Sequence, residues 1–142
     1  MQPAQNFAKA ANFIRSAASQ GAQLAVLPEY HLTNWKPHEP EFIELAKEWK
    51  TYLGWYTDLA KEVGICIVPG TIVEWHEEIK GGEGERLLNV AYFIDGTGEV
   101  VGKYVKKNLW YVLLSILCCV VFCQPVLCFV CRFGETNGEK GT

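Results

Sequence analysis

One uncharged segment divides this 142-residue chain into two parts of different character. From Leu109 to Cys131 there are 23 consecutive residues without a charged side chain, and five of the six cysteines lie among them. Residues 1–108 hold 11 Lys and Arg against 14 Asp and Glu, so the net charge of −3 belongs to them. We therefore expect an organised α/β domain over residues 1–110 and an apolar, cysteine-rich tail over residues 111–142.

The charge and the remaining cysteine exclude several classes of protein. A net charge of −3 argues against a nucleic-acid partner, because such proteins present a basic surface. Cys66 is the only cysteine before the uncharged segment, which favours a reducing compartment over a disulfide framework. The N-terminus has no basic region followed by an apolar one, so the default expectation is a cytoplasmic protein.

Hydrophobic spacing predicts an alternation of helices and strands. Apolar residues at helical spacing predict one helix over residues 7–18 and a second, single helix over residues 40–63, each followed by a glycine. The short apolar runs at residues 22–28 and 65–68 indicate buried strands. The order strand, helix, strand implies a parallel pair with a right-handed crossover.

The next part of the chain predicts a loop and a hairpin. Residues 74–86 are polar and rich in glycine at their centre, which indicates an exposed loop. The loop includes His76, which has no second histidine at the spacing of a zinc-protease motif. Residues 87–94 and 100–105 are predicted strands, joined through the turn-forming Asp-Gly-Thr-Gly sequence between them.

Glu29 is the first candidate for chemistry. It comes directly after a predicted parallel strand, and the carboxyl ends of such strands are where ligands and catalytic groups gather. Pro28, Tyr30, His31 and Trp35 surround it with bulk that can exclude water, and a desolvated carboxylate suits general-base work. The alternative is an ordinary solvated loop carboxylate, and for His31 an ordinary loop histidine.

Three stretches, in the right order, resemble the nitrilase superfamily of carbon–nitrogen hydrolases. Residues 22–30 (AQLAVLPEY) resemble its first catalytic motif, which ends on the catalytic glutamate. Residues 68–74 are similar to the next strand of that family, and residues 88–104 resemble the hairpin that leads to its catalytic lysine. The resemblance ends near residue 110, so it covers an amino-terminal portion of the family only.

The resemblance implies a fold, a reaction and two site residues. The family pattern Tyr-x-Lys-x-x-Leu falls on Tyr104, Lys106 and Leu109, which matches Lys106 to the catalytic lysine as Glu29 is matched to the glutamate. The implied fold is a partial four-layer αββα sandwich, truncated after the lysine strand. The family hydrolyses small nitriles or linear non-peptide amides through a Glu-Lys-Cys triad, without metal or cofactor, and commonly forms homodimers.

The cysteine of this triad has no counterpart in the sequence. The family places it a few dozen residues after the lysine, in a context like Gly-x-x-x-Cys-x-Asp, and expects a supporting glutamate before it. Cys131 is nearest in distance, but Arg132 and Phe133 follow it and no acidic partner is present. We therefore expect this form to be inactive. The alternative is a non-catalytic fragment, anchored to a membrane or paired with full-length subunits.

The uncharged segment itself has three interpretations. Residues 109–131 are long enough for a transmembrane anchor, which needs about 20 residues, with Lys103, Lys106 and Lys107 on the cytoplasmic side. Such an anchor would place the protein at a membrane. The cysteines could instead bind zinc, although Cys128 and Cys131 form an isolated C-x-x-C pair in apolar surroundings that oppose thiolates.

The third interpretation is that residues 111–142 translate a retained intron or an alternative 3′ end. The family pattern stops in mid-motif after Trp110, where no domain boundary belongs. The codons for Trp110, Tyr111 and Val112 can read GGTATGT, a sequence that suits a splice donor. The sequence favours this interpretation over the anchor and the zinc site.

Overall fold

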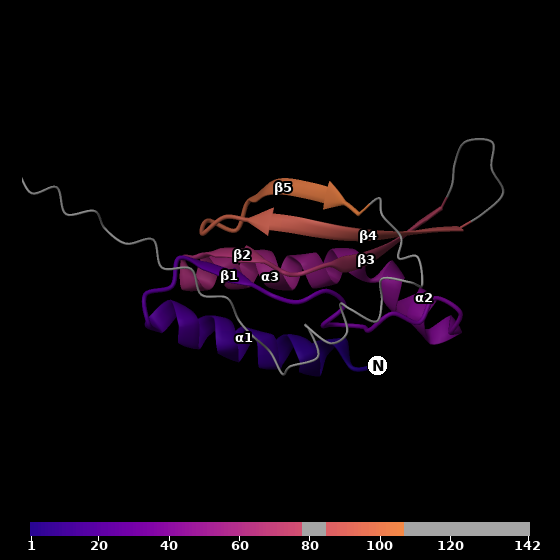
Figure 1. The fold of residues 1–142 in the computed structure, drawn as a ribbon, viewed down its shortest axis with the longest axis horizontal. Helices are drawn as coiled ribbons and strands as arrows, with labels where there is room; N and C mark the ends of the chain where they lie inside the picture. The colour runs from indigo at the N-terminus through magenta and orange to yellow at the C-terminus, as the bar shows by residue number, and fades with distance from the viewer. Residues whose placement is uncertain (78–84, 107–142) are drawn as a thin grey trace, which may run out of the picture.

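The computed structural model describes residues 1–77 and 85–106, which form three helices and a five-stranded sheet (Figure 1). In chain order the elements are α1 (Pro3–Ser19), β1 (Leu24–Val26), α2 (Pro40–Lys47), α3 (Trp49–Val63), β2 (Cys66–Val68), β3 (Ile72–Glu77), β4 (Glu85–Ile94) and β5 (Val100–Val105). The predicted tail over residues 111–142, with the 109–131 segment and Cys131, lies outside the described residues.

The predicted parallel pair is confirmed. β1 and β2 run parallel, with Leu24 opposite Cys66 and Val26 opposite Val68, and α2 and α3 lie between them in the chain. α1 covers the strands with the stripe that the sequence predicts, burying Ala10, Ala11, Ile14 and Ala17. It ends before Gly21, whose φ of 85° is a left-handed conformation that glycine adopts without strain.

The predicted single helix over residues 40–63 is wrong, because the chain breaks at Glu48. Glu48 has φ −82° and ψ 11° and serves as the C-cap of α2 and the N-cap of α3. The break lets the two helices bury different faces. Phe42 and Ala46 of α2 pack with Val73 in a small cluster, whereas the apolar face of α3 joins the main core. Tertiary packing therefore overrides a continuous helical pattern.

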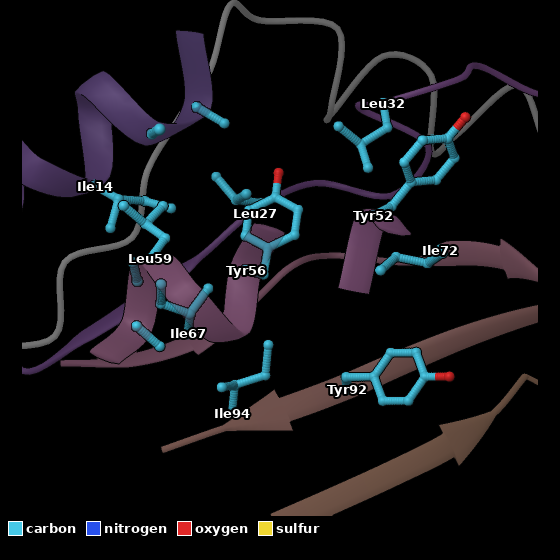
Figure 2. Close-up of a cluster of buried hydrophobic side chains, with 14 of the residues drawn as sticks. Ile14, Leu27, Leu32, Tyr52, Tyr56, Leu59, Ile67, Ile72, Tyr92 and Ile94 are labelled. Carbon is cyan, nitrogen blue, oxygen red and sulfur yellow. The ribbon is translucent and has the colours of Figure 1, made fainter. Parts of the chain in front are cut away.

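The main core lies between the helices and one face of the sheet. Figure 2 shows Ile14 of α1 and Leu59 of α3 together with Ile67 of β2 and Ile94 of β4, all of which are buried. Tyr56 of α3 fills the space between them and is fully buried. Burial of side chains of this size stabilises a fold by about 1.5–3 kcal/mol each, so this layer holds the helices on the sheet.

β4 is the central strand of the sheet, with which β2, β3 and β5 all pair. It pairs antiparallel with β2 and β3 along one edge and with β5 along the other. The hairpin predicted over residues 87–94 and 100–105 is thus confirmed. On the face away from the main core, Phe93 of β4 and Tyr104 of β5 remain 39% and 59% exposed. A helix layer and one sheet correspond to half of a four-layer αββα sandwich.

The prediction of an exposed loop over residues 74–86 is wrong at both ends. β3 continues to Glu77 and β4 begins at Glu85, and residues 78–84 between them lie outside the described residues. Glu74 is fully buried, with Leu88 opposite it on β4. β3 contains polar residues because Glu74 and His76 contact each other and Glu74 contacts side chains of β4 and β5, as described below.

The connection between β2 and β3 passes against the end of β1. The registers of the two strands on β4 differ by one residue, so residues 69–71 form an irregularity along a nearly continuous edge. Gly70 lies there with φ 65°, and a Cβ on it would lie 2.0 Å from the carbonyl oxygen of Pro28. Only glycine allows this approach, which places the connection directly beside Glu29.

Candidate active site

The structure brings Glu29 and Lys106 together. The Lys106 Nζ atom lies 2.7 Å from Oε1 and 3.0 Å from Oε2 of Glu29, across 77 residues of sequence. Glu29 follows the carboxyl end of β1 and Lys106 follows the end of β5, so both strands end at the same side of the sheet. The side chains are 39% and 22% exposed, respectively, so solvent and small molecules can reach the pair.

Tyr30 turns the chain sharply after Glu29. Its φ of 54° is the left-handed conformation, which is uncommon and strained for a residue other than glycine. Its backbone N–H donates to Oγ1 of Thr71 at 3.4 Å, and its ring packs 5.4 Å from that of Trp35. Burial, and then the negative charge of Glu29, raise the pKa of Tyr30 to about 12, so the phenol stays protonated at neutral pH.

Asn89 is a residue to which the sequence assigned no role. Its side-chain amide on β4 donates to the Tyr30 hydroxyl at 2.7 Å, and its backbone carbonyl accepts from the Lys106 N–H at 2.9 Å. It therefore contacts the neighbour of Glu29 and Lys106 itself. The only signal in the sequence was its place inside the stretch that resembles the lysine hairpin.

His31 packs beneath the same turn. Its Nδ1 atom lies 3.1 Å from the Pro28 carbonyl oxygen, which can only accept, so Nδ1 carries the proton in the neutral ring. Nε2 then accepts from the Tyr56 hydroxyl. Burial, only partly offset by the bond to Pro28, lowers the pKa of His31 to about 4. His31 is a neutral brace of the Glu29 turn, and the interpretation of it as an ordinary loop histidine is wrong.

From the lowered pKa of the partly buried His31 we predict a loss of stability in mild acid. The folded-state pKa of about 4 lies below the ordinary value of 6.5, so the contribution of His31 is complete above pH 6.5 and is lost as the pH falls toward 4. The loss should approach about 3 kcal/mol over that window. Urea unfolding at several pH values measures it. His31→Asn should flatten the curve, and His38→Asn, which removes an exposed histidine of the same loop, should not. An unchanged acid profile in His31→Asn would contradict the assignment.

A second glutamate–lysine pair has a different environment. The buried Glu74 carboxylate accepts from the Tyr92 hydroxyl, lies 2.6 Å from Nε2 of His76 and 3.0 Å from Nζ of Lys103. Burial alone would raise the pKa of Glu74, but the hydrogen bonds from Tyr92, His76 and Lys103 together hold it below its usual value. His76 is therefore part of an ionic cluster on β3, and the prediction of a solvated loop histidine is wrong. The cluster ties three strands together.

The part of the chain that the structure describes offers no candidate metal site and no candidate nucleophile beside Glu29. No group of three or more His, Cys, Asp or Glu lies close enough there to hold a metal ion. Cys66 is level with Leu24 at the amino end of the parallel pair, whereas Glu29 follows its carboxyl end. Cys66 therefore stands at the wrong end of the strands to act with Glu29.

No helix within residues 1–77 and 85–106 is long and apolar enough to cross a membrane.

The arrangement suits acid–base chemistry on a polar bond. A carboxylate in contact with an ammonium group can take up and return a proton, while the ammonium group stabilises negative charge that develops on an oxygen or nitrogen atom. Both groups follow strand ends, and partly buried hydrogen bonds from Asn89 and to Thr71 hold the turn after Glu29. A nucleophile brought to this side of the sheet would complete a site for acyl transfer.

Comparisons with known proteins agree with this arrangement. A nitrilase of Pyrococcus abyssi is 36% identical over 118 residues, which cover 78% of this chain and 40% of the relative. A carbon–nitrogen hydrolase of Helicobacter pylori G27 has a similar fold, with a TM-score of 0.63 at 18% identity over 77% of this chain and 36% of that one. An amidase of Nesterenkonia sp. AN1 gives a TM-score of 0.61 at 22% identity over 78% of this chain and 41% of that one.

These matches cover only part of each relative. The chain spans about 40% of the length of the curated relative that it matches. The family match covers most of this chain, because residues 1–117 match the carbon-nitrogen hydrolase family. Because the family match covers more than half of this chain, the chain belongs to the carbon–nitrogen hydrolase family.

Proposed function

We propose that Glu29 and Lys106 are the glutamate and lysine of a Glu-Lys-Cys triad that hydrolyses a small nitrile or a linear non-peptide amide. The observation that carries this proposal is the contact of 2.7 Å between Lys106 Nζ and Glu29 Oε1. Two residues 77 positions apart, each matched separately to a family motif, meet at one end of the sheet. Amidase activity in a structural relative also supports an amide as substrate.

The proposed reaction assigns one role to each side chain. The Glu29 carboxylate takes the proton of a cysteine thiol, and the thiolate attacks the amide carbon. Lys106 stabilises the oxyanion of the tetrahedral intermediate. Glu29 then gives its proton to the leaving nitrogen, so ammonia or an amine departs and a thioester remains. Glu29 next takes a proton from water, which attacks the thioester and releases the acid and the thiol.

The thiol is the part that this sequence does not supply in a recognisable context. In the Nesterenkonia amidase, acrylamide adds to an active-site cysteine, which supports a thiol as nucleophile in enzymes of this fold. After Lys106, the cysteines of this chain stand among apolar residues, without the acidic residue of the family motif. We therefore propose that a protein of these 142 residues does not cleave an amide by this route.

The test is an assay of ammonia release by the purified 142-residue chain. Butyramide and a short nitrile are suitable substrates, because the C145A mutant of the Nesterenkonia amidase forms a complex with butyramide. We expect no release above the rate without protein. Release that Cys131→Ala abolishes would show that the tail supplies a working nucleophile and would overturn the proposed inactivity. Release that survives Glu29→Gln would overturn the proposed role of the glutamate.

A further inference from the structure

Asn89 joins the two halves of the candidate site. Its backbone carbonyl accepts from the N–H of Lys106 at 2.9 Å, so β4 fixes where the lysine leaves the end of β5. Its side-chain amide reaches across to the Tyr30 hydroxyl at 2.7 Å, and Tyr30 directly follows Glu29. One residue on the central strand thus contacts both the lysine and the turn that carries the glutamate.

The turn at Tyr30 needs such a contact. The left-handed φ of 54° is unfavourable for tyrosine and persists only where surrounding contacts determine it. The hydrogen bond from the Tyr30 N–H to Thr71 is long, at 3.4 Å, and the packing on Trp35 involves a ring that is itself 39% exposed. The hydrogen bond from the buried Asn89 amide is shorter, at 2.7 Å, and comes from the central strand of the sheet.

Asn89 is also an unfavourable residue for a purely structural role. It is 7% exposed, and among the described residues its Oδ1 atom has no hydrogen-bond partner. A buried acceptor without a donor reduces stability, and an apolar side chain of the same size would avoid that cost. Its neighbours on β4, Leu88 and Val90, are apolar. A polar residue at this position is therefore explained by its contact with Tyr30.

We propose that Asn89 is a positioning residue for the Glu29–Lys106 pair, acting through the Tyr30 hydroxyl. The role of Asn89 in catalysis rests on the function proposed above, whereas its role in holding Glu29 beside Lys106 does not. Without the Asn89 amide, Tyr30 relaxes from its strained conformation, Glu29 moves with it, and the ammonium group of Lys106 loses its carboxylate partner.

Competitive labelling of lysines in the intact 142-residue chain tests this statement. A small excess of acetic anhydride modifies each lysine according to the availability of its amine, and mass spectrometry gives the ratio of Lys106 to Lys103 labelling. Lys103 of β5, three residues before Lys106, is an internal control because its amine pairs with Glu74 instead of Glu29. Glu29→Gln gives the labelling ratio that is expected when the ion pair between Glu29 and Lys106 is weakened directly.

Asn89→Leu should raise the labelling ratio by about threefold or more, because it removes the side-chain bond and keeps the volume and the backbone bond. Tyr30→Phe should raise it to the same extent, and the double variant should add nothing further, since both changes remove one interaction. Val90→Ala, which truncates a buried neighbour on the opposite face of β4, should leave the ratio unchanged.

Three results would overturn the proposal. The first is an unchanged ratio in Asn89→Leu, and the second is a parallel rise at Lys103 and Lys106, which indicates general loosening. The third is an additive rise in the double variant. If Asn89→Leu does not fold, Tyr30→Phe alone decides, with the same expected rise. Since labelling needs no turnover, failure of the proposed hydrolysis leaves this test intact, and the two proposals fail separately.

Discussion

Glu74→Ala is expected to lower the free energy of unfolding by about 3 kcal/mol, the largest effect on stability among the charged residues discussed above. The carboxylate is fully buried and contacts groups from three strands: Tyr92 of β4, Lys103 of β5 and His76 of β3 itself. Its removal leaves the Tyr92 hydroxyl without its acceptor and leaves a space where the fully buried carboxylate lies. Urea unfolding at pH 7 measures the loss.

The matched control is Glu62→Ala, which removes the exposed partner of Arg15 and should leave the free energy of unfolding nearly unchanged. The acid profile gives a second check. Because the folded-state pKa of Glu74 lies below its usual value, its contribution is complete above pH 4.5 and is lost as the pH falls through the lowered value. Glu74→Ala should remove that part of the acid sensitivity. A loss under about 1 kcal/mol at pH 7 would contradict the assignment of a structural ionic cluster.

Unlike Glu74→Ala, Glu29→Gln is expected to have a large effect on turnover and a small effect on stability. The measurement needs a thiol, so the enzyme is a chimera of residues 1–106 followed by the part of the Pyrococcus abyssi relative beyond its aligned lysine. Loss of the general base should lower kcat/KM by roughly 10²–10⁴-fold. Glutamine has the shape of glutamate but cannot take up the thiol proton.

Stability should hardly respond to the same substitution. The Glu29–Lys106 pair is 39% and 22% exposed, and pairs at such positions contribute about 0–1 kcal/mol. Unfolding of the 142-residue chain with and without Glu29→Gln measures this change, and Glu74→Gln in the chimera is the matched control. That control should reduce stability more than Glu29→Gln does, yet leave more of the turnover. Equal losses of activity in the two variants would remove the distinction between a catalytic and a structural pair.

The parallel pair and the position of Glu29 could be predicted from local sequence. Short apolar runs bounded by glycine and proline fix β1 and β2, and a residue directly after a buried strand must lie at its carboxyl end. The order of motifs then identified Lys106 as its expected partner. The strand predictions succeed because they depend on neighbours within a few residues, whereas the match of Lys106 came from the family resemblance.

The remaining features depend on contacts between distant segments. Glu74 looked like a loop residue because a charged side chain on a strand is unfavourable unless partners such as Tyr92 and Lys103 approach from other strands. The break at Glu48 arises because α2 and α3 bury their apolar faces in different clusters. The role of Asn89 could not be predicted either, since its partner Tyr30 is 59 residues away and adopts a conformation that its side chain disfavours.

Ammonia release from butyramide by the chimera, compared with the 142-residue chain, tests the central claim most directly. The claim is that residues 1–106 hold the glutamate and the lysine of a hydrolase site that needs only a correctly placed thiol. We predict steady release by the chimera, none by the 142-residue chain, and loss of release in the chimera that carries Glu29→Gln. A folded chimera that releases no ammonia, or one whose release is unaffected by Glu29→Gln, would contradict the claim.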